Sequence, residues 1–107
     1  MVKALILYPK PDDRAAFERH YYDIHLPLVR KIPHLKSLSV NRDPPTTLVG
    51  KSPYHLVVEL EFASQQDCDA AFASAESRLA AEDLATFAPP GRVRFVYEVR
   101  SVMPETA

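Results

Sequence analysis

The chain has 107 residues, of which 47% are hydrophobic and 25% are charged, and its net charge is −1. These values are typical of one small globular domain, so we expect a single soluble unit over residues 1–107. The lysines and arginines are dispersed rather than clustered, which argues against nucleic-acid binding. No apolar run reaches the ~18–20 residues of a membrane-spanning helix, so we expect no membrane partner.

The cysteine content and the first residues indicate a cellular compartment. Cys68 is the only cysteine and therefore cannot form an internal disulfide bond. The apolar run Met1–Tyr8 is too short for a secretion signal and is followed by charges. Both observations favour a reducing, cytoplasmic location. A lone cysteine can also act as a nucleophile, but Cys68 lies in an alanine-rich helical stretch and we interpret it as structural.

The first predicted elements are a strand and an amphipathic helix. Val2–Tyr8 is a short apolar run that ends at a proline, and Asp12 and Asp13 then stand where a helix start favours a capping side chain. Pro27 lies inside the helical pattern and predicts a kink or split, because proline lacks a backbone N–H and crowds the preceding turn. Five apolar residues define the buried face of this helix: Phe17, Tyr21, Ile24, Leu28 and Ile32.

Two strands are predicted in the middle of the chain. Leu35–Arg42 alternates between apolar and polar residues, and Tyr54–Phe62 does so more clearly. Asp43–Pro53, with three prolines and Gly50, is predicted to be the loop between them.

The last third of the chain is predicted to hold two helical stretches and a strand. Ser64 has the spacing of a helix cap before the first stretch, and Pro89-Pro90-Gly91 ends the second. Arg92–Val102 is the predicted last strand, and Pro104–Ala107 is expected to be frayed.

The order β-α-β-β-α-β predicts an α+β, ferredoxin-like domain with an antiparallel four-stranded sheet and two helices on one face. By alternation, we expect Val58, Leu60, Phe95 and Tyr97 to face the helices. The opposite face would then mix apolar side chains with balanced carboxylates and guanidiniums. Such a face is compatible with solvent or with the sheet of a second copy.

Familiar catalytic and metal motifs are absent. The chain has no Gly-rich phosphate loop, no Cys-x-x-Cys, no His-Glu-x-x-His and no Gly-x-Ser-x-Gly. His20, Asp23 and His25 invite a metal interpretation, but an α-helix places the two histidines roughly 140° apart, so they cannot converge on one ion unless the kink at Pro27 rearranges the turn. We therefore predict no metal site.

A proton-transfer site is the remaining candidate. His25 lies at the edge of the apolar helix face, near Pro27, where an imidazole could exchange a proton with a ligand or merely be a hydrogen-bonded flank residue. Tyr21, Tyr54 and Tyr97 are assigned to the same side of the sheet, as core residues or as ligand contacts. His55 is expected on the opposite sheet face.

The chain resembles the EthD family, named after ethyl tert-butyl ether degradation. The matching segments run in order along nearly the whole chain: ALILYPKPDD, FERHYYDIHLPLVRKIPHLKSLSVNR, SPYHLVVELEF and EDLATFAPPGRVRFVYEV. The most distinctive segment is FxxHYxxxHxPL, here Phe17 through Leu28. The resemblance implies a dimeric α+β barrel, in which the sheets of two copies close around a shared interior and each copy keeps a cavity between its sheet and first helices.

The resemblance also implies a function. We expect the homodimer to act on a small apolar or aromatic molecule in oxidative degradation, with cofactor-independent proton-transfer, oxygenation or isomerase-like chemistry. His25 would be the catalytic residue, and Tyr21, Tyr54, Tyr97 and His20 would bind the substrate. Two alternatives stay open at this point: a non-catalytic carrier of a degradation intermediate, and an interaction module without a ligand.

Overall fold

The computed structural model describes residues 1–51 and 53–104, so that Ser52 of the predicted loop and residues 105–107 of the expected frayed end lie outside it. The first half holds β1 (Val2–Pro9), α1 (Arg14–His20), η1 (Tyr21–His25), α2 (Leu26–Val29) and β2 (Ser37–Val40). The second half holds β3 (Tyr54–Phe62), α3 (Gln65–Phe72), α4 (Ala75–Phe87) and β4 (Val93–Glu98). The predicted β-α-β-β-α-β order is confirmed.

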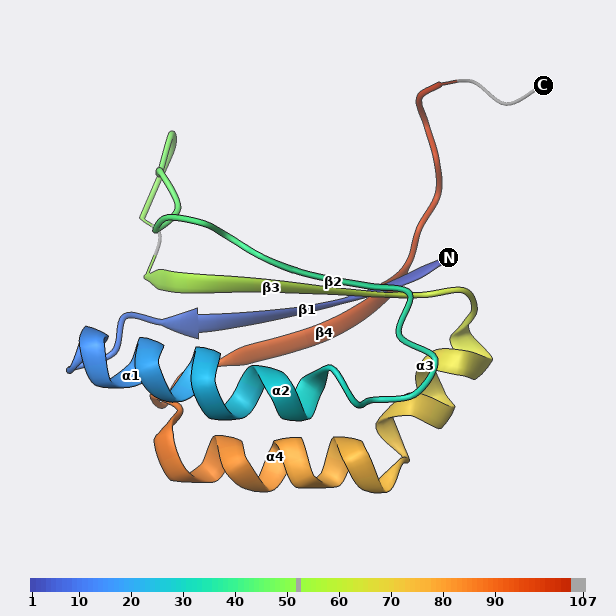
Figure 1. Ribbon diagram of the computed structural model, residues 1–107. Coiled ribbons are helices and arrows are strands. Elements are labelled where there is room, and N and C mark those ends of the chain that lie inside the picture. Colours follow the sequence, from blue (N-terminus) through green and yellow to red (C-terminus); the bar gives the residue numbers. More distant parts are fainter. Residues whose placement is uncertain (52, 105–107) are drawn as a thin grey trace.

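The strands form one antiparallel sheet in the order β2-β3-β1-β4, which confirms the α+β, ferredoxin-like topology. The helices cover one face of this sheet, while the β2–β3 loop and the C-terminal segment extend beyond the other face (Figure 1). None of the helices within the described residues has the length and hydropathy that crossing a bilayer requires.

The helix between β1 and β2 contains a wide π-helical turn over Tyr21–His25. The backbone N–H of Leu26 donates to the carbonyl of Tyr21, five residues earlier. Pro27 accounts for this turn, because in a regular α-helix its ring would press against the carbonyl of Asp23. The turn therefore takes the place of the predicted kink.

The π turn adds one residue and shifts the buried stripe of the helix. Ile24, predicted on the buried face, is 51% exposed, whereas His25 and Leu26 are buried. Beyond the turn, Val29 and Ile32 continue the buried stripe. The strict α-helical spacing therefore assigned Ile24 to the wrong face.

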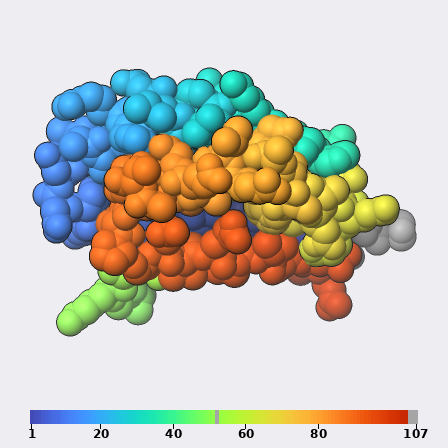
Figure 2. Space-filling view, turned by 90° about the horizontal axis from the view of Figure 1, so that it is seen from below, coloured from blue at the N-terminus to red at the C-terminus, as the bar shows by residue number. Residues whose placement is uncertain are grey.

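The predicted orientation of β4 is also wrong. Phe95 pairs with Leu5 and Tyr97 with Lys3, whereas Val96 pairs with Ala4, a residue buried under the helices. Residues paired across a sheet point to the same face, so Phe95 and Tyr97 lie on the face without helices. Seen from the helical side, β4 (red) lies along the uncovered edge of the molecule (Figure 2). Every residue of β4 is exposed, which explains why alternation alone could not tell its two faces apart.

The face without helices carries a group of one lysine and two glutamates. Lys3 Nζ lies 2.6 Å from Glu59 Oε1 and 3.8 Å from Glu61 Oε1, and these carboxylates raise the pKa of Lys3. The same face carries apolar side chains, including Val93, Phe95 and Tyr97 on β4, each more than a third exposed. We call this surface the open face.

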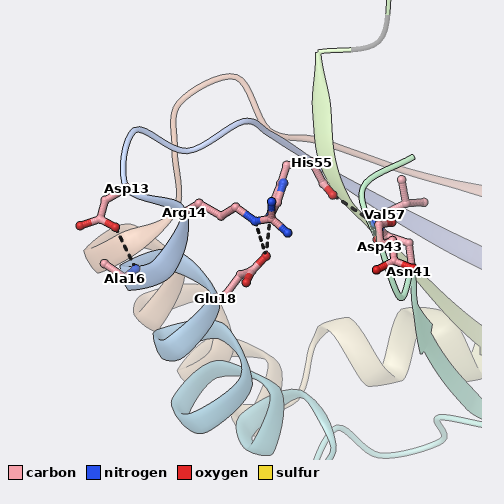
Figure 3. Close-up of polar contacts among 8 residues, drawn as sticks. All are labelled: Asp13, Arg14, Ala16, Glu18, Asn41, Asp43, His55 and Val57. Carbon is pink, nitrogen blue, oxygen red and sulfur yellow. Dashed lines mark hydrogen bonds and ion pairs between the residues drawn. The ribbon is translucent and has the colours of Figure 1, made fainter. Parts of the chain in front are cut away.

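The prediction that His55 lies on the open face is wrong, because its side chain packs against α1. Its Nε2 lies 3.0 Å from Glu18 Oε1, which also accepts a hydrogen bond of 3.1 Å from Arg14 Nε (Figure 3). The pairing of β1 with β3 shifts between Tyr8 and Pro9, so alternation fails there and both His55 and Leu56 are buried. In the same region, the Asp13 side chain caps α1 by accepting from the N–H of Ala16, as predicted.

Candidate active site

Two histidines and one aspartate meet between η1 and α4. Asp83 Oδ1 lies 2.8 Å from His20 Nε2, and Asp83 Oδ2 lies 3.0 Å from His25 Nδ1. The side chain of His25 is 3% exposed, that of Asp83 13% and that of His20 25%. One carboxylate therefore joins a buried imidazole to an accessible one, and we call the three residues the His–Asp–His group.

The wide turn makes this group possible. In an α-helix His20 and His25 would diverge by roughly 140°, as the sequence analysis assumed. A π turn repeats after about five residues, so it brings both rings to the side that faces α4. This is the rearrangement near Pro27 that the sequence left open, and it brings the two histidines to one carboxylate.

Asp83 was missed by sequence analysis. It lies 63 residues from His20 and 58 from His25, in a helix with no recognisable motif. Only the packing of α4 against the first helical segment brings it to the two rings.

Burial and hydrogen bonding shift the pKa values of His25 and Asp83 in opposite directions. Burial lowers the pKa of His25 by more than its hydrogen bond to Asp83 raises it. Burial alone would raise the pKa of Asp83, but the hydrogen bonds from His20 and His25 hold it below its usual range. Near neutral pH the group therefore contains an ionised Asp83 and a neutral His25.

A pocket of about 500 Å³ lies beside the accessible histidine. It is formed where the β1–α1 and α4–β4 connections meet, and its walls include Phe17, His20, Phe87 and Pro89. The rings of His20 and Phe87 stack with centroids 4.1 Å apart. A volume of this size suits a small organic ligand.

The predicted site residues divide between three places. His20 lines the pocket, whereas His25 lies behind Asp83 and is not part of the pocket wall. Tyr21 is 1% exposed and packs edge-on against Tyr8. Tyr54 is half-buried at the start of β3, opposite Pro9, and Tyr97 lies on the open face. The structure therefore does not place Tyr54 or Tyr97 beside the two histidines.

Other reactive groups give no second centre. Among the residues that the structure describes, no group of three or more His, Cys, Asp or Glu side chains could hold a metal ion. Cys68 is buried in α3, and burial raises the pKa of its thiol, which disfavours the reactive thiolate.

The lowered pKa of His25 predicts acid sensitivity. Unfolded histidine titrates near ~6.5, so below that pH the unfolded chain binds a proton that folded His25 resists. The part of the free energy of unfolding that depends on neutral, buried His25 is fully present above pH ~6.5. It is lost as pH falls, with a slope of at most about 1.4 kcal/mol per pH unit. Urea unfolding at pH 7, 6 and 5 should show a steeper loss in the wild type than in His25→Gln. An equal slope in both proteins would exclude His25 as the cause; the exposed His34→Asn serves as the control.

Comparisons with known proteins agree on one family. The family model of the EthD domain matches residues 10–91. An uncharacterized 11.0 kDa protein from the thcB–thcC intergenic region of Rhodococcus erythropolis is 35% identical over 105 residues, covering 97% of this chain and all of that protein. A crystal structure of an EthD family protein from Bacillus halodurans is 31% identical, with a TM-score of 0.84, and the match covers 94% of this chain and 99% of that one.

More distant structures share the fold. SnoaB from Streptomyces nogalater, described as a cofactor-independent oxygenase, is 13% identical with a TM-score of 0.66, over 97% of both chains. Three further structures, between 15% and 18% identical, are described as dimeric proteins with a ferredoxin-like fold and unknown function.

Proposed function

Because the chain belongs to the EthD family, we propose that it acts on a small neutral aromatic or apolar molecule, in oxidative degradation, by cofactor-independent proton transfer. The observation that carries this proposal is the His–Asp–His group beside the pocket. His20 takes the catalytic role, since it is the member of the group that lines the pocket. His25, expected from the sequence to be the catalytic residue, takes a supporting role behind Asp83.

The pocket walls support an apolar ligand. Phe17, Phe87, Pro89 and neighbouring prolines supply flat hydrocarbon surface on which an aromatic ring can pack. An imidazole takes a proton from an activated carbon or a phenol without help from a cofactor. The description of SnoaB as a cofactor-independent oxygenase is compatible with such chemistry on this fold.

The charges at the pocket favour a neutral ligand. Lys10, Asp12 and Asp13 line its rim, a net charge of one negative unit, and the Asp83 carboxylate lies behind His20. An anionic ligand would meet repulsion from these carboxylates. We therefore expect phenol to bind in preference to benzoate, an anion of similar size.

We propose that the protein works as a homodimer through the open face. Its exposed aromatic side chains and the Lys3–Glu59 pair offer the mixture of apolar and paired-charge contacts that two sheets can share. The dimeric descriptions of the structures with this fold support this assembly.

The proposed proton transfer can be tested without the natural substrate. 5-Nitrobenzisoxazole is a neutral aromatic probe: a base removes its C3 proton, the N–O bond breaks, and an absorbing cyano-nitrophenolate forms. We expect the wild type to accelerate this reaction and His20→Gln to lose about 10²–10⁴-fold of the enzyme-dependent rate, the usual contribution of a general base. The measurement is initial rate by absorbance.

His34→Asn provides the matched control, because it removes another histidine, one that is exposed and distant from the pocket in sequence. Its rate should equal that of the wild type. An equal rate in His20→Gln would exclude His20 as the base. Binding of the probe without any acceleration would instead identify the carrier function that the sequence left open.

A further inference from the structure

The hydrogen bonds of Asp83 restrict the two imidazoles. An ionised carboxylate can only accept hydrogen bonds, so each imidazole nitrogen that faces it must carry a proton. His20 faces Asp83 through Nε2 and His25 faces it through Nδ1. A neutral imidazole has one proton on its two nitrogens, so the two rings are held in opposite tautomers.

We propose that Asp83 fixes His20 as the Nε2–H tautomer, which leaves Nδ1 of His20 as the base of the pocket, with His25 as a neutral donor that positions Asp83. This inference rests on the proposed function for the identity of the pocket, but not for the state of the two rings. His20 is the catalytic residue in this scheme, and Asp83 and His25 are positioning residues.

The surroundings of His25 fit a permanently neutral donor. Its ring packs against those of Tyr21, at a centroid distance of 5.4 Å, and Phe87, at 5.3 Å. A cation there would lose its hydration and would also face any charge on His20, which is bound to the same carboxylate. Burial accordingly lowers the pKa of His25.

The stacking of His20 on Phe87 adds a geometric restriction. The two rings are inclined by only 24°, so one face of the imidazole is covered, and a proton is exchanged at the edge of the ring, where the nitrogen lone pairs lie. Nε2 on that edge is occupied by Asp83, so Nδ1 is the nitrogen that remains. The hydrogen bond and the stacking together hold the ring in one orientation.

The proton balance of the step is simple. The bond between the ligand's acidic atom and its proton breaks, and its electron pair stays on the ligand. A new N–H bond forms at Nδ1 of His20. The resulting imidazolium is stabilised by Asp83 through the existing Nε2–H bond, as the aspartate does for the histidine of a Ser-His-Asp triad.

The tautomers can be measured directly in the ligand-free protein. Two-bond ¹H–¹⁵N correlation spectra at pH 8 distinguish protonated from unprotonated ring nitrogens. We expect Nε2–H for His20 and Nδ1–H for His25 in the wild type. In Asp83→Asn the amide offers one acceptor and one donor, so at least one of the two rings should exchange its tautomer. Glu82→Gln, at the neighbouring exposed carboxylate of α4, should leave both unchanged.

Two results would overturn the proposal: a wild-type His20 protonated at Nδ1, or unchanged tautomers in Asp83→Asn. The wild-type spectrum decides the first point even if Asp83→Asn does not fold. The spectra are independent of ligand binding. The two proposals can therefore fail separately. If the tautomers are as expected but 5-nitrobenzisoxazole does not react, only the proposed function is rejected. If the tautomers are reversed but turnover is retained, only the role of Asp83 is rejected.

Discussion

Replacing Tyr21 by alanine is expected to lower the free energy of unfolding by about 3–5 kcal/mol, the usual cost of truncating a large buried aromatic residue. Tyr21 is 1% exposed and stacks on Phe17, with ring centroids 6.0 Å apart. It also contacts Tyr8 and His25. The cavity left by its ring would therefore lie beside the His–Asp–His group, and the measurement is urea unfolding at pH 7.

Tyr22 supplies the control within the same turn. It is 41% exposed, so Tyr22→Ala should change the free energy of unfolding by less than about 1 kcal/mol. Burial raises the pKa of Tyr21, and that of Tyr8 to about 12, which agrees with phenols that stay protonated inside a core. A loss below about 1 kcal/mol for Tyr21→Ala would contradict the core assignment and would return Tyr21 to the candidate ligand contacts.

The sequence predicted those elements whose signals are local. Asp13 caps α1 and Ser64 caps α3, each by accepting from a backbone N–H three residues later. Tyr54–Phe62 is a strand over its full predicted length, and alternation identifies its buried face from Leu56 to Phe62 but not at Tyr54, which lies beyond the shift in register. In each case one short segment contains all the information needed.

The candidate site depended on information that no short segment contains. Pro27 was correctly interpreted as a disturbance of the helix, but the sequence did not indicate that the chain would respond with a π turn rather than a kink. That single extra residue brings His20 and His25 together and exposes Ile24. Asp83 comes from the other end of the chain, and nothing in its neighbourhood marks it as a partner.

The orientation of β4 failed for a different reason. Both of its faces carry apolar side chains, and alternation defines two sets without saying which one is covered. Only the register with β1 settles the question, since Ala4 is buried under the helices and Val96 lies opposite to it. The correction moves Phe95 and Tyr97 from the expected ligand cavity to the open face.

Replacing Phe95 by glutamate is expected to separate the proposed homodimer into monomers. Phe95 is 43% exposed on the open face, next to Leu5 of β1. In a two-fold interface the substitution introduces two carboxylates at once, each without a partner. A cost of several kcal/mol would raise the dissociation constant at least ~100-fold, since each 1.4 kcal/mol corresponds to a factor of ten. Light scattering at micromolar concentration should give twice the 12.1 kDa chain mass for the wild type and a single chain for the variant.

Val96→Glu is the matched control, because it places the same charge on the adjacent residue of the same strand. Val96 is 39% exposed, nearly as much as Phe95, but it points to the helical side of the sheet. It should therefore leave the dimer intact. Dissociation by both variants would indicate that β4 pairs through its edge rather than through the open face, whereas a monomeric wild type would contradict the dimer itself. If only Phe95→Glu dissociates and its turnover of 5-nitrobenzisoxazole is retained, the pocket beside His20 functions within one chain, and the open face serves assembly alone.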